Sequence, residues 1–126
     1  MNPETFLNNG SVHVWDQSFA IIRSRRTHPE AFANIIDHNE TTVIIDETKV
    51  DEEDIIEIQN GWKLLTFDMV LPLELVGFLA TVSSAFVEEE IPIFAVPAYS
   101  TDHIFVRDKD LPKAKEKLRT LGCRID

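Results

Sequence analysis

The sequence predicts an α+β fold in which an antiparallel sheet carries its helices on one face. The chain has 126 residues, 44% of them hydrophobic, enough for one compact domain or two small halves sharing a core. The second half is predicted to run strand, helix, strand, strand, helix, an order that right-handed connections fold into such a sheet. The first half repeats part of this order at a period of roughly 60 residues, so we expect a duplicated domain with a degenerate first unit.

Two pairs of strands are predicted in the first half of the chain. Short apolar runs broken by polar turn residues indicate them, and the β-branched run at residues 42–45 (TVII) suits a strand better than a helix. The predicted strands are residues 12–15 and 19–25, joined at 16–18, and residues 32–37 and 41–46, joined at 38–40.

One short helix and a flexible arm complete the first half. Residues 51–59 are predicted to be helical, because the acidic residues 51–54 complement the positive end of a helix dipole, and Gly61 is expected to end the helix. A metal site is the alternative interpretation of the acidic run, and the helix start is preferred. Residues 1–10 are polar and include Pro3, so we expect a flexible arm there.

The second half carries the clearer patterns. Apolar residues recur at helical spacing over residues 73–89, after Pro72, and again over residues 111–121, before Gly122. Strands are predicted at residues 62–68, 91–96 and 103–107. The predicted organisation is a flexible arm at 1–10, a degenerate half at 11–60 and a complete domain at 61–126.

The charge of the chain disfavours nucleic acid and membrane partners. It has 12 basic and 22 acidic residues, a formal charge of −10, whereas a phosphate backbone requires a basic face. The basic cluster Arg23, Arg25 and Arg26 is interpreted as a solvated strand end, with an anion site as the alternative. No stretch approaches the ~20 apolar residues of a membrane span, and no signal-peptide pattern begins the chain. The lone Cys123 fits a reducing compartment, so a cytoplasmic protein is expected.

The sequence shows no catalytic or metal-binding pattern, so we expect no enzyme activity, metal or cofactor. Ser100, Asp102 and His103 lie too close together on one predicted strand to line up as nucleophile, orienting acid and base. The glycines form no phosphate-binding loop, and the strands lack the paired aromatic and basic residues of an RNA-binding sheet. The histidines also lack the spacing of a zinc site; they are His13, His28, His38 and His103.

Three segments of the second half form a recognisable combination: residues 71–80 (LPLELVGFLA), 90–96 (EIPIFAV) and 99–106 (YSTDHIFV). Together they resemble the ACT domain family of the aspartate-kinase-like type, and they are similar to CASTOR-type amino-acid sensors. Gly77 matches the glycine of the family's first helix. Residues 19–23 (FAIIR) and 61–62 (GW) match more loosely. The resemblance implies a ferredoxin-like βαββαβ ACT fold, in tandem with a degenerate first unit.

The resemblance also implies a ligand site where the first helix of the second half faces a loop. The backbone amides of residues 76–79 would hold an α-carboxylate, as helix N-termini do. Asp102 would accept the α-ammonium group, and the hydroxyl groups of Ser100 and Thr101 would assist. The implied ligand-binding residues are Val76, Gly77, Phe78, Leu79, Ile93, Phe94, Ser100, Thr101 and Asp102.

Other interpretations of these residues stay open. Gly77 could serve tight helix–sheet packing, Asp102 could cap a hairpin turn, and Pro97 removes a backbone donor that a ligand could use. Glu74 or Asp68 could meet a basic ligand side chain.

The favoured function is a small-molecule sensor, with an amino acid as the expected ligand, in a homodimer joined along sheet edges. The alternatives are a ligand-free interaction scaffold of the same fold and, less favoured, a small hydrolase or isomerase.

Overall fold

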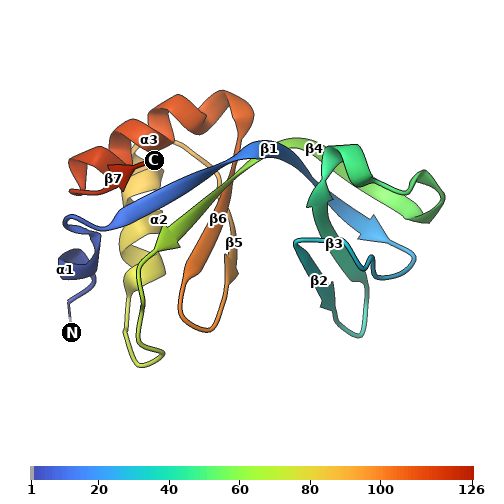
Figure 1. Ribbon diagram of the computed structural model, residues 1–126, viewed down its shortest axis with the longest axis horizontal. Helices are drawn as coiled ribbons and strands as arrows, with labels where there is room; N and C mark the ends of the chain where they lie inside the picture. Colours follow the sequence, from blue (N-terminus) through green and yellow to red (C-terminus); the bar gives the residue numbers. More distant parts are fainter. Residues whose placement is uncertain (1) are drawn as a thin grey trace. The chain divides into compact units, whose positions relative to one another are not determined.

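The longest elements of the chain are two strands of 14 residues each, β1 (Ser11–Ser24) and β4 (Ile55–Asp68) (Figure 1). The computed structural model describes residues 2–126. The chain divides into two compact units, which we call the helical unit (residues up to Trp15, with Lys63–Asp126) and the β unit (Asp16–Trp62). Each long strand contributes one part of its length to each unit.

The helical unit combines a sheet with two longer helices, α2 (Phe78–Glu88) and α3 (Leu111–Thr120). Its strands lie in the order β1-β4-β6-β5, with β6 antiparallel to β5 and β7 parallel to β1. Its other elements are α1 (Pro3–Leu7), β5 (Phe94–Pro97), β6 (Asp102–Arg107), the 3₁₀ turn η3 (Asp108–Asp110) and β7 (Arg124–Ile125). This arrangement confirms the predicted α+β, ferredoxin-like fold.

A single hydrophobic core explains why both helices cover one face of this sheet. Phe67 of β4 and Val106 of β6 lie in one buried cluster with Phe86 of α2 and Leu118 of α3. Because alternate strand residues face opposite sides, both helices pack on the side to which Phe67 and Val106 point. Phe67 also meets Phe78 edge to face, with ring centroids 5.3 Å apart. Each such buried side chain contributes about 1.5–3 kcal/mol.

The β unit contains strands and 3₁₀ turns but, throughout its described residues, no α-helix. Within it, β2 pairs antiparallel with β3, β3 pairs antiparallel with β1, and β4 lies on the other side of β1. The elements that it adds are β2 (Ala33–Ile36), β3 (Thr41–Asp46), η1 (Glu47–Lys49) and η2 (Glu52–Asp54). The predicted pair of strands around residues 38–40 is therefore confirmed.

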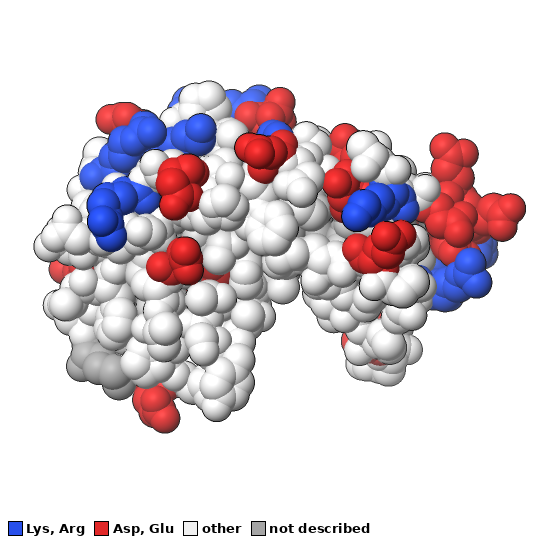
Figure 2. All heavy atoms as spheres, in the orientation of Figure 1, with Lys and Arg blue, Asp and Glu red and all other residues white. Residues whose placement is uncertain are grey.

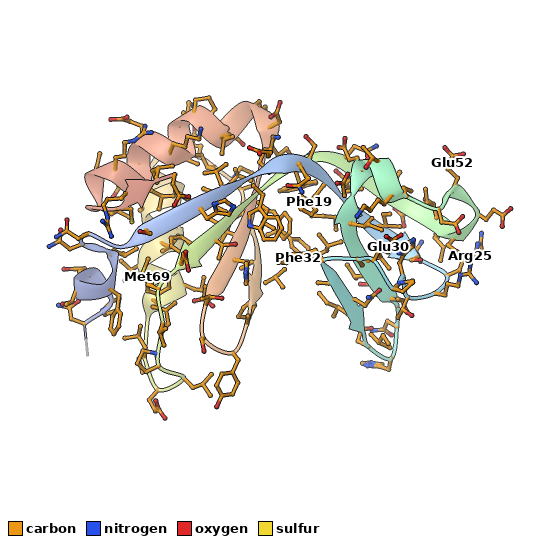
Figure 3. All side chains as sticks on the ribbon, viewed as in Figure 1. Phe19, Arg25, Glu30, Phe32, Glu52 and Met69 are labelled. Carbon is orange, nitrogen blue, oxygen red and sulfur yellow. The ribbon has the colours of Figure 1, made fainter. Side chains whose placement is uncertain are left out.

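The core of the β unit is small. Its cluster of buried residues consists of Ala20 and Ile22 of β1 with Val43 and Ile45 of β3. Figure 3 shows Phe19 and Phe32 facing each other, and their rings meet edge to face with centroids 6.1 Å apart. Phe19, Ile44 and Trp62 are also buried, outside this cluster, and cross-strand contacts between such side chains stabilise the sheet.

Two predictions for the first half are wrong. Residues 16–18 form no turn but continue β1: Asp16 and Ser18 favour a turn, but no glycine or proline forces one, and strand pairing on either side of them keeps the backbone extended. Residues 51–59 form no α-helix: η2 leads at Ile55 into β4, whose three isoleucines at its start favour a strand. Gly61 ends no helix but lies within β4 at a φ of 82°, and its N–H donates to Oε1 of Glu47 at 2.6 Å.

The N-terminal residues also differ from the prediction of a flexible arm. Residues Pro3–Leu7 form α1, and Asn2 caps it by accepting a hydrogen bond on Oδ1 from the N–H of Glu4 at 2.9 Å. Leu7 is only 1% exposed and belongs to the core of the helical unit. Leu7, together with Phe6, which packs on the same core, anchors this mostly polar segment.

In the second half, one helix is shorter than predicted. The predicted helix over residues 73–89 begins only at Phe78, because Gly77 has a left-handed φ of 83° and stands outside the helix as its N-cap. The predicted helix over residues 111–121 and the predicted strand over residues 103–107 are confirmed. Along the chain the division between the units falls after Trp15 and after Trp62. The origin of the β unit as a degenerate copy stays a prediction.

Candidate functional site

A cavity of about 200 Å³ opens at one end of the helical unit. It lies between the β4–α2 loop, whose first residue Met69 is labelled in Figure 3, and the β5–β6 loop. The first loop contributes Leu71, Pro72, Leu73 and Leu75, α2 contributes Phe78, and the second loop contributes residues 97–102. The cavity therefore includes the predicted loop at residues 100–102 and, of the predicted helix start at residues 76–79, Phe78.

Backbone hydrogen bonds hold the two loops together. The N–H of Leu71 donates to the carbonyl of Ser100 at 2.6 Å, which joins one loop directly to the other. Within the second loop, the N–H of Ala98 donates to the carbonyl of Thr101 at 2.9 Å and closes a turn. Leu71 and Phe78 are both buried, so the hydrophobic core anchors one side of the cavity. The site is thus shaped before any ligand arrives.

The start of α2 presents free amide groups. The N–H of Thr81 makes the first helical bond, to the carbonyl of Gly77 at 2.9 Å, so the preceding amides have no helical acceptor. Gly77 has no side chain that could cap them. Its left-handed backbone also turns the chain sharply into the helix, which a residue with Cβ would adopt only with strain. These amides and the positive end of the helix dipole suit a carboxylate.

Asp102 supplies the charge of the cavity. It is the first residue of β6 and pairs with Pro97 across the hairpin. Partial burial raises the pKa of the Asp102 carboxyl above its usual value, and the charge of the neighbouring His103 opposes the shift. A carboxylate that burial disfavours gains more than a fully solvated one from a cationic partner, such as an ammonium group.

The cavity brings together some of the residues predicted to bind a ligand but not all. Phe78, Ser100, Thr101 and Asp102 line it. The other predicted residues, Val76, Gly77, Leu79, Ile93 and Phe94, do not line it. The side chain of Val76 is 83% exposed, Leu79 and Ile93 pack on the core, and Phe94 meets Phe105 edge to face at 6.4 Å. Any role of residues 76, 77 and 79 would therefore belong to their backbone.

The leucines of the first loop are site residues that sequence reasoning missed. Leu71, Leu73 and Leu75 line the cavity, whereas the sequence assigned the last two to a helix. Gly77 was the signal that could have found them, because a glycine preceding a helix favours a sharp turn and leaves the residues before it in a loop. Neither Asp68 nor Glu74, the carboxylates considered for a basic ligand, lines the cavity.

Other reactive groups of the described chain do not form a second centre. Burial raises the pKa of the Cys123 thiol to about 11, and its Sγ lies 3.5 Å from the carbonyl of Leu7, so it is a poor nucleophile. Across residues 2–126 no group of three or more His, Cys, Asp or Glu residues is arranged to hold a metal ion. The described helices include none with both the length and the apolar character that crossing a membrane requires.

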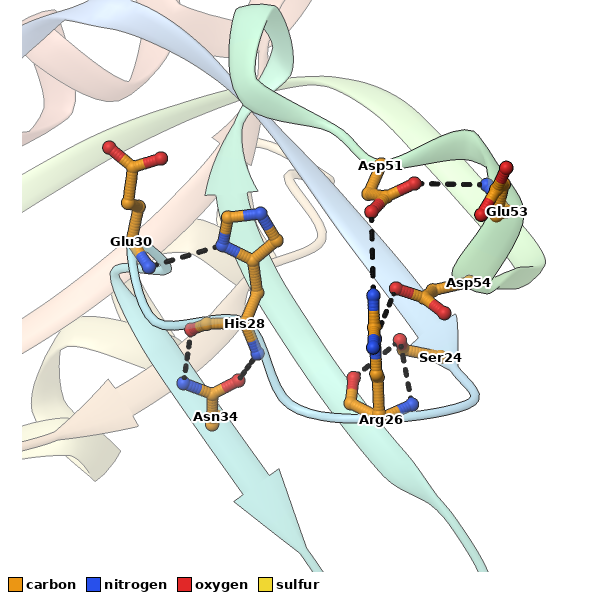
Figure 4. A network of polar contacts seen from close by, with 8 residues as sticks. All are labelled: Ser24, Arg26, His28, Glu30, Asn34, Asp51, Glu53 and Asp54. Atoms are coloured by element: carbon orange, nitrogen blue, oxygen red, sulfur yellow. Dashed lines mark hydrogen bonds and ion pairs between the residues drawn. The ribbon is translucent and has the colours of Figure 1, made fainter.

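Arg23 and Arg26, two arginines of the β unit, contact carboxylates. Arg26 contacts Asp54 through Nε at 2.7 Å and Asp51 at 3.7 Å, a network drawn in Figure 4. The hydrogen bond with Asp54 raises the pKa of the Arg26 guanidinium. Arg23 pairs with Glu57 at 2.6 Å. These contacts favour the interpretation of the basic cluster as a solvated strand end over an anion site.

The fold and the cavity together define a class of regulatory modules that bind small molecules. The family model for the ACT domain matches residues 57–120, just over half of the chain, so the chain belongs to the ACT domain family. Regulatory domains of aspartate kinases occur among the similar solved structures, in agreement with the aspartate-kinase-like type. No curated protein matches the chain.

Three solved structures illustrate how far the likeness extends. A protein from Agobacterium tumefaciens superimposes with a TM-score of 0.75 at 20% identity, over 94% of this chain and 92% of its own. A protein of unknown function from Vibrio cholerae, described as a possible transport protein, gives 0.77 at 19% identity, over 92% of both chains. The ligand-free regulatory subunit of aspartate kinase from Thermus thermophilus gives 0.63 at 7% identity, over 91% and 98%. At these identities the structures show a shared fold alone.

Proposed function

We propose that this chain is a regulatory module that binds one free amino acid in the cavity of the helical unit. The observation that carries the proposal is the cavity itself, which sets the partly buried carboxylate of Asp102 beside Ser100 and Thr101, among apolar side chains. An amino acid offers a cation, an anion and a side chain, and each of them has a complementary group at this site.

The binding mode follows from that complementarity. The α-ammonium group pairs with the carboxylate of Asp102, and the hydroxyl groups of Ser100 and Thr101 donate to the α-carboxylate. The amides at the start of α2, after Gly77, add further donors for the same carboxylate. The side chain of the ligand then lies against the apolar wall. Membership of the ACT family, a family of regulatory modules, supports this mode.

The proposed module acts by binding rather than by catalysis. The family match is to the ACT domain, regulatory domains of aspartate kinases occur among the similar structures, and the described lining of the cavity includes no histidine, lysine or cysteine. We expect the module to work in the cytoplasm, without a cofactor, as a homodimer. In such a dimer β5, the last strand of the sheet order, would meet its counterpart in a second copy, and ligand would stabilise the assembly.

Thermal-shift and calorimetric screening against the common amino acids tests the proposal. At least one amino acid is expected to raise the melting temperature, and Asp102→Asn is expected to abolish that shift. Asp108→Asn is the matched control, because Asp108 follows the other end of β6 and does not line the cavity. A shift that persists in Asp102→Asn would contradict the proposed site, and the absence of any shift or heat would contradict the function.

A ligand-free scaffold is the second candidate, and one observation favours it. Large apolar side chains are exposed on the two loops around the cavity, among them Val70 at 76%, Leu73 at 67% and Tyr99 at 80%. Exposed apolar groups gathered in this way are typical of protein interfaces. A tight dimer that shows no response to any amino acid would support this candidate over the sensor.

A further inference from the structure

We infer that the cavity selects amino acids with an uncharged, apolar side chain, an inference that rests on the proposed amino-acid binding. The walls of the cavity carry it. Leu71, Leu73 and Leu75 line one side, Pro97 and Tyr99 line the other, and Phe78 contributes from α2. The leucines, Pro97 and Phe78 offer dispersion contacts through their side chains, so an apolar ligand group placed against them replaces water at little polar cost. The polar surface of the cavity belongs to Tyr99, Ser100, Thr101, Asp102 and the backbone.

A basic amino acid does not fit the side chains that line the cavity. Of the described residues that line the cavity, Asp102 carries the only charge, and the α-ammonium group of the ligand requires it. The second cation of lysine or arginine would therefore lie against leucines without a partner, which is costly. Asp68 and Glu74 are carboxylates that could pair with the side-chain cation, but neither of them lines the cavity.

An acidic amino acid fits no better. Its second carboxylate would approach Asp102 in a cavity without a basic lining residue, on a chain with a formal charge of −10. Like charges at such short range repel each other, and the repulsion is greatest where water is excluded. In Figure 2 the lower end of the helical unit, where Figure 1 shows the two loops, is largely free of charged side chains.

The volume of the cavity further limits the size of the ligand. At about 200 Å³ it is smaller than the roughly 300–1,000 Å³ of pockets for larger organic ligands. A single small molecule is therefore the expected occupant. Each methylene of the ligand that is buried adds about fourfold in affinity, so affinity should rise from alanine through valine to leucine.

Isothermal titration calorimetry on the full chain with matched pairs of amino acids tests the inference. Norleucine and lysine share a straight stem, and valine and threonine share a shape, so each pair differs mainly in polarity. The apolar member should bind at least about tenfold more tightly in both pairs, because the polar member buries a group without a partner. Equal or tighter binding of lysine or threonine would overturn the inference and leave the proposed function standing. No binding of any amino acid would overturn both.

A pair of variants tests whether the side chains lining the cavity cause the preference for apolar amino acids. Leu73→Asp adds a carboxylate to the wall at a position that is largely exposed, so the fold should persist. It should weaken norleucine binding about tenfold and bring the affinity for lysine to at least that for norleucine. Val70→Asp is the matched control, on the same loop and exposed but outside the cavity lining, and should leave the preference unchanged. The same preference in both variants would contradict a wall formed by Leu73, and circular dichroism would verify that each variant folds.

Discussion

The helical unit and the β unit use the same two long strands but bury very different amounts of apolar surface. The main buried cluster of the helical unit draws on its sheet, on α2 and α3 and on Leu7 of α1. One buried cluster of the β unit consists of Ala20, Ile22, Val43 and Ile45, and exposed ion pairs such as Arg23–Glu57 lie on the same unit. Because exposed ion pairs add little stability, we infer that the helical unit is the rigid platform on which a binding cavity can be shaped.

The largest expected effect of a substitution lies in the helical core. Phe86→Ala removes a ring with no exposed surface and should lower the free energy of unfolding by about 3–5 kcal/mol, measured by urea denaturation. Val87→Ala changes the next residue of the same helix, which is 72% exposed, and should change stability by less than about 0.5 kcal/mol. Similar effects of the two substitutions would show that α2 does not pack as described.

Two glycines with left-handed backbones allow a direct comparison of the units. Gly77 precedes α2 with a φ of 83°, Gly61 lies within β4 with a φ of 82°, and a Cβ at either would meet no close neighbour. Substitution to alanine should therefore cost about 1–2 kcal/mol at each position, from backbone strain alone. Only Gly77→Ala should also weaken amino-acid binding, because only Gly77 positions the amides of α2. Equal weakening by Gly61→Ala would contradict the assignment of the site to the helical unit.

A smaller effect concerns the dependence of stability on pH through Asp102. Burial raises its pKa in the folded state, so the folded state holds this proton more strongly than the unfolded state does. Stability should therefore fall as the pH rises from the ordinary aspartate pKa of 3.8 through the folded-state pKa, and stay lower above it. Asp102→Asn should remove this small loss, so that the ligand-free variant is at least as stable as the parent at pH 7. Chemical denaturation of the parent and of Asp102→Asn at pH 3 and at pH 7 measures this difference in the free energy of unfolding. If the variant were less stable than the parent at pH 7 but not at pH 3, the raised pKa of Asp102 would be contradicted.

How much of the molecule the sequence could predict depended on how unambiguous each local pattern was. The helix over residues 111–120 and the strand pair around residues 38–40 were predictable, because capping glycine, turn residues and apolar spacing agree there. The residues at 51–59 were not, because an acidic start favours a helix whereas the isoleucines that follow favour a strand, and pairing within the sheet decides between them.

The candidate site was predictable at its polar side and not at its apolar side. Ser100, Thr101 and Asp102 were indicated by the resemblance to the ACT family, whereas the local sequence alone fits a cap of a hairpin turn as well. Leu73 and Leu75 were assigned to a helix and Leu71 was not assigned to the site, since sequence spacing alone does not distinguish a ligand-facing leucine from a core leucine. The left-handed backbone of Gly77 decides where these leucines lie, because it ends the β4–α2 loop and α2 begins only after it. The leucines therefore belong to the loop and not to the helix.

The central claim is that an amino acid binds in the cavity of the helical unit, and a titration followed by ¹H–¹⁵N NMR tests it most directly. With norleucine as the probe, the account predicts saturable shifts at residues 71–79 and 97–103, and unchanged amide signals for Ala20, Ile22, Val43 and Ile45 in the core of the β unit. Shifts centred on the β unit, or no shifts with norleucine or any other amino acid, would contradict it.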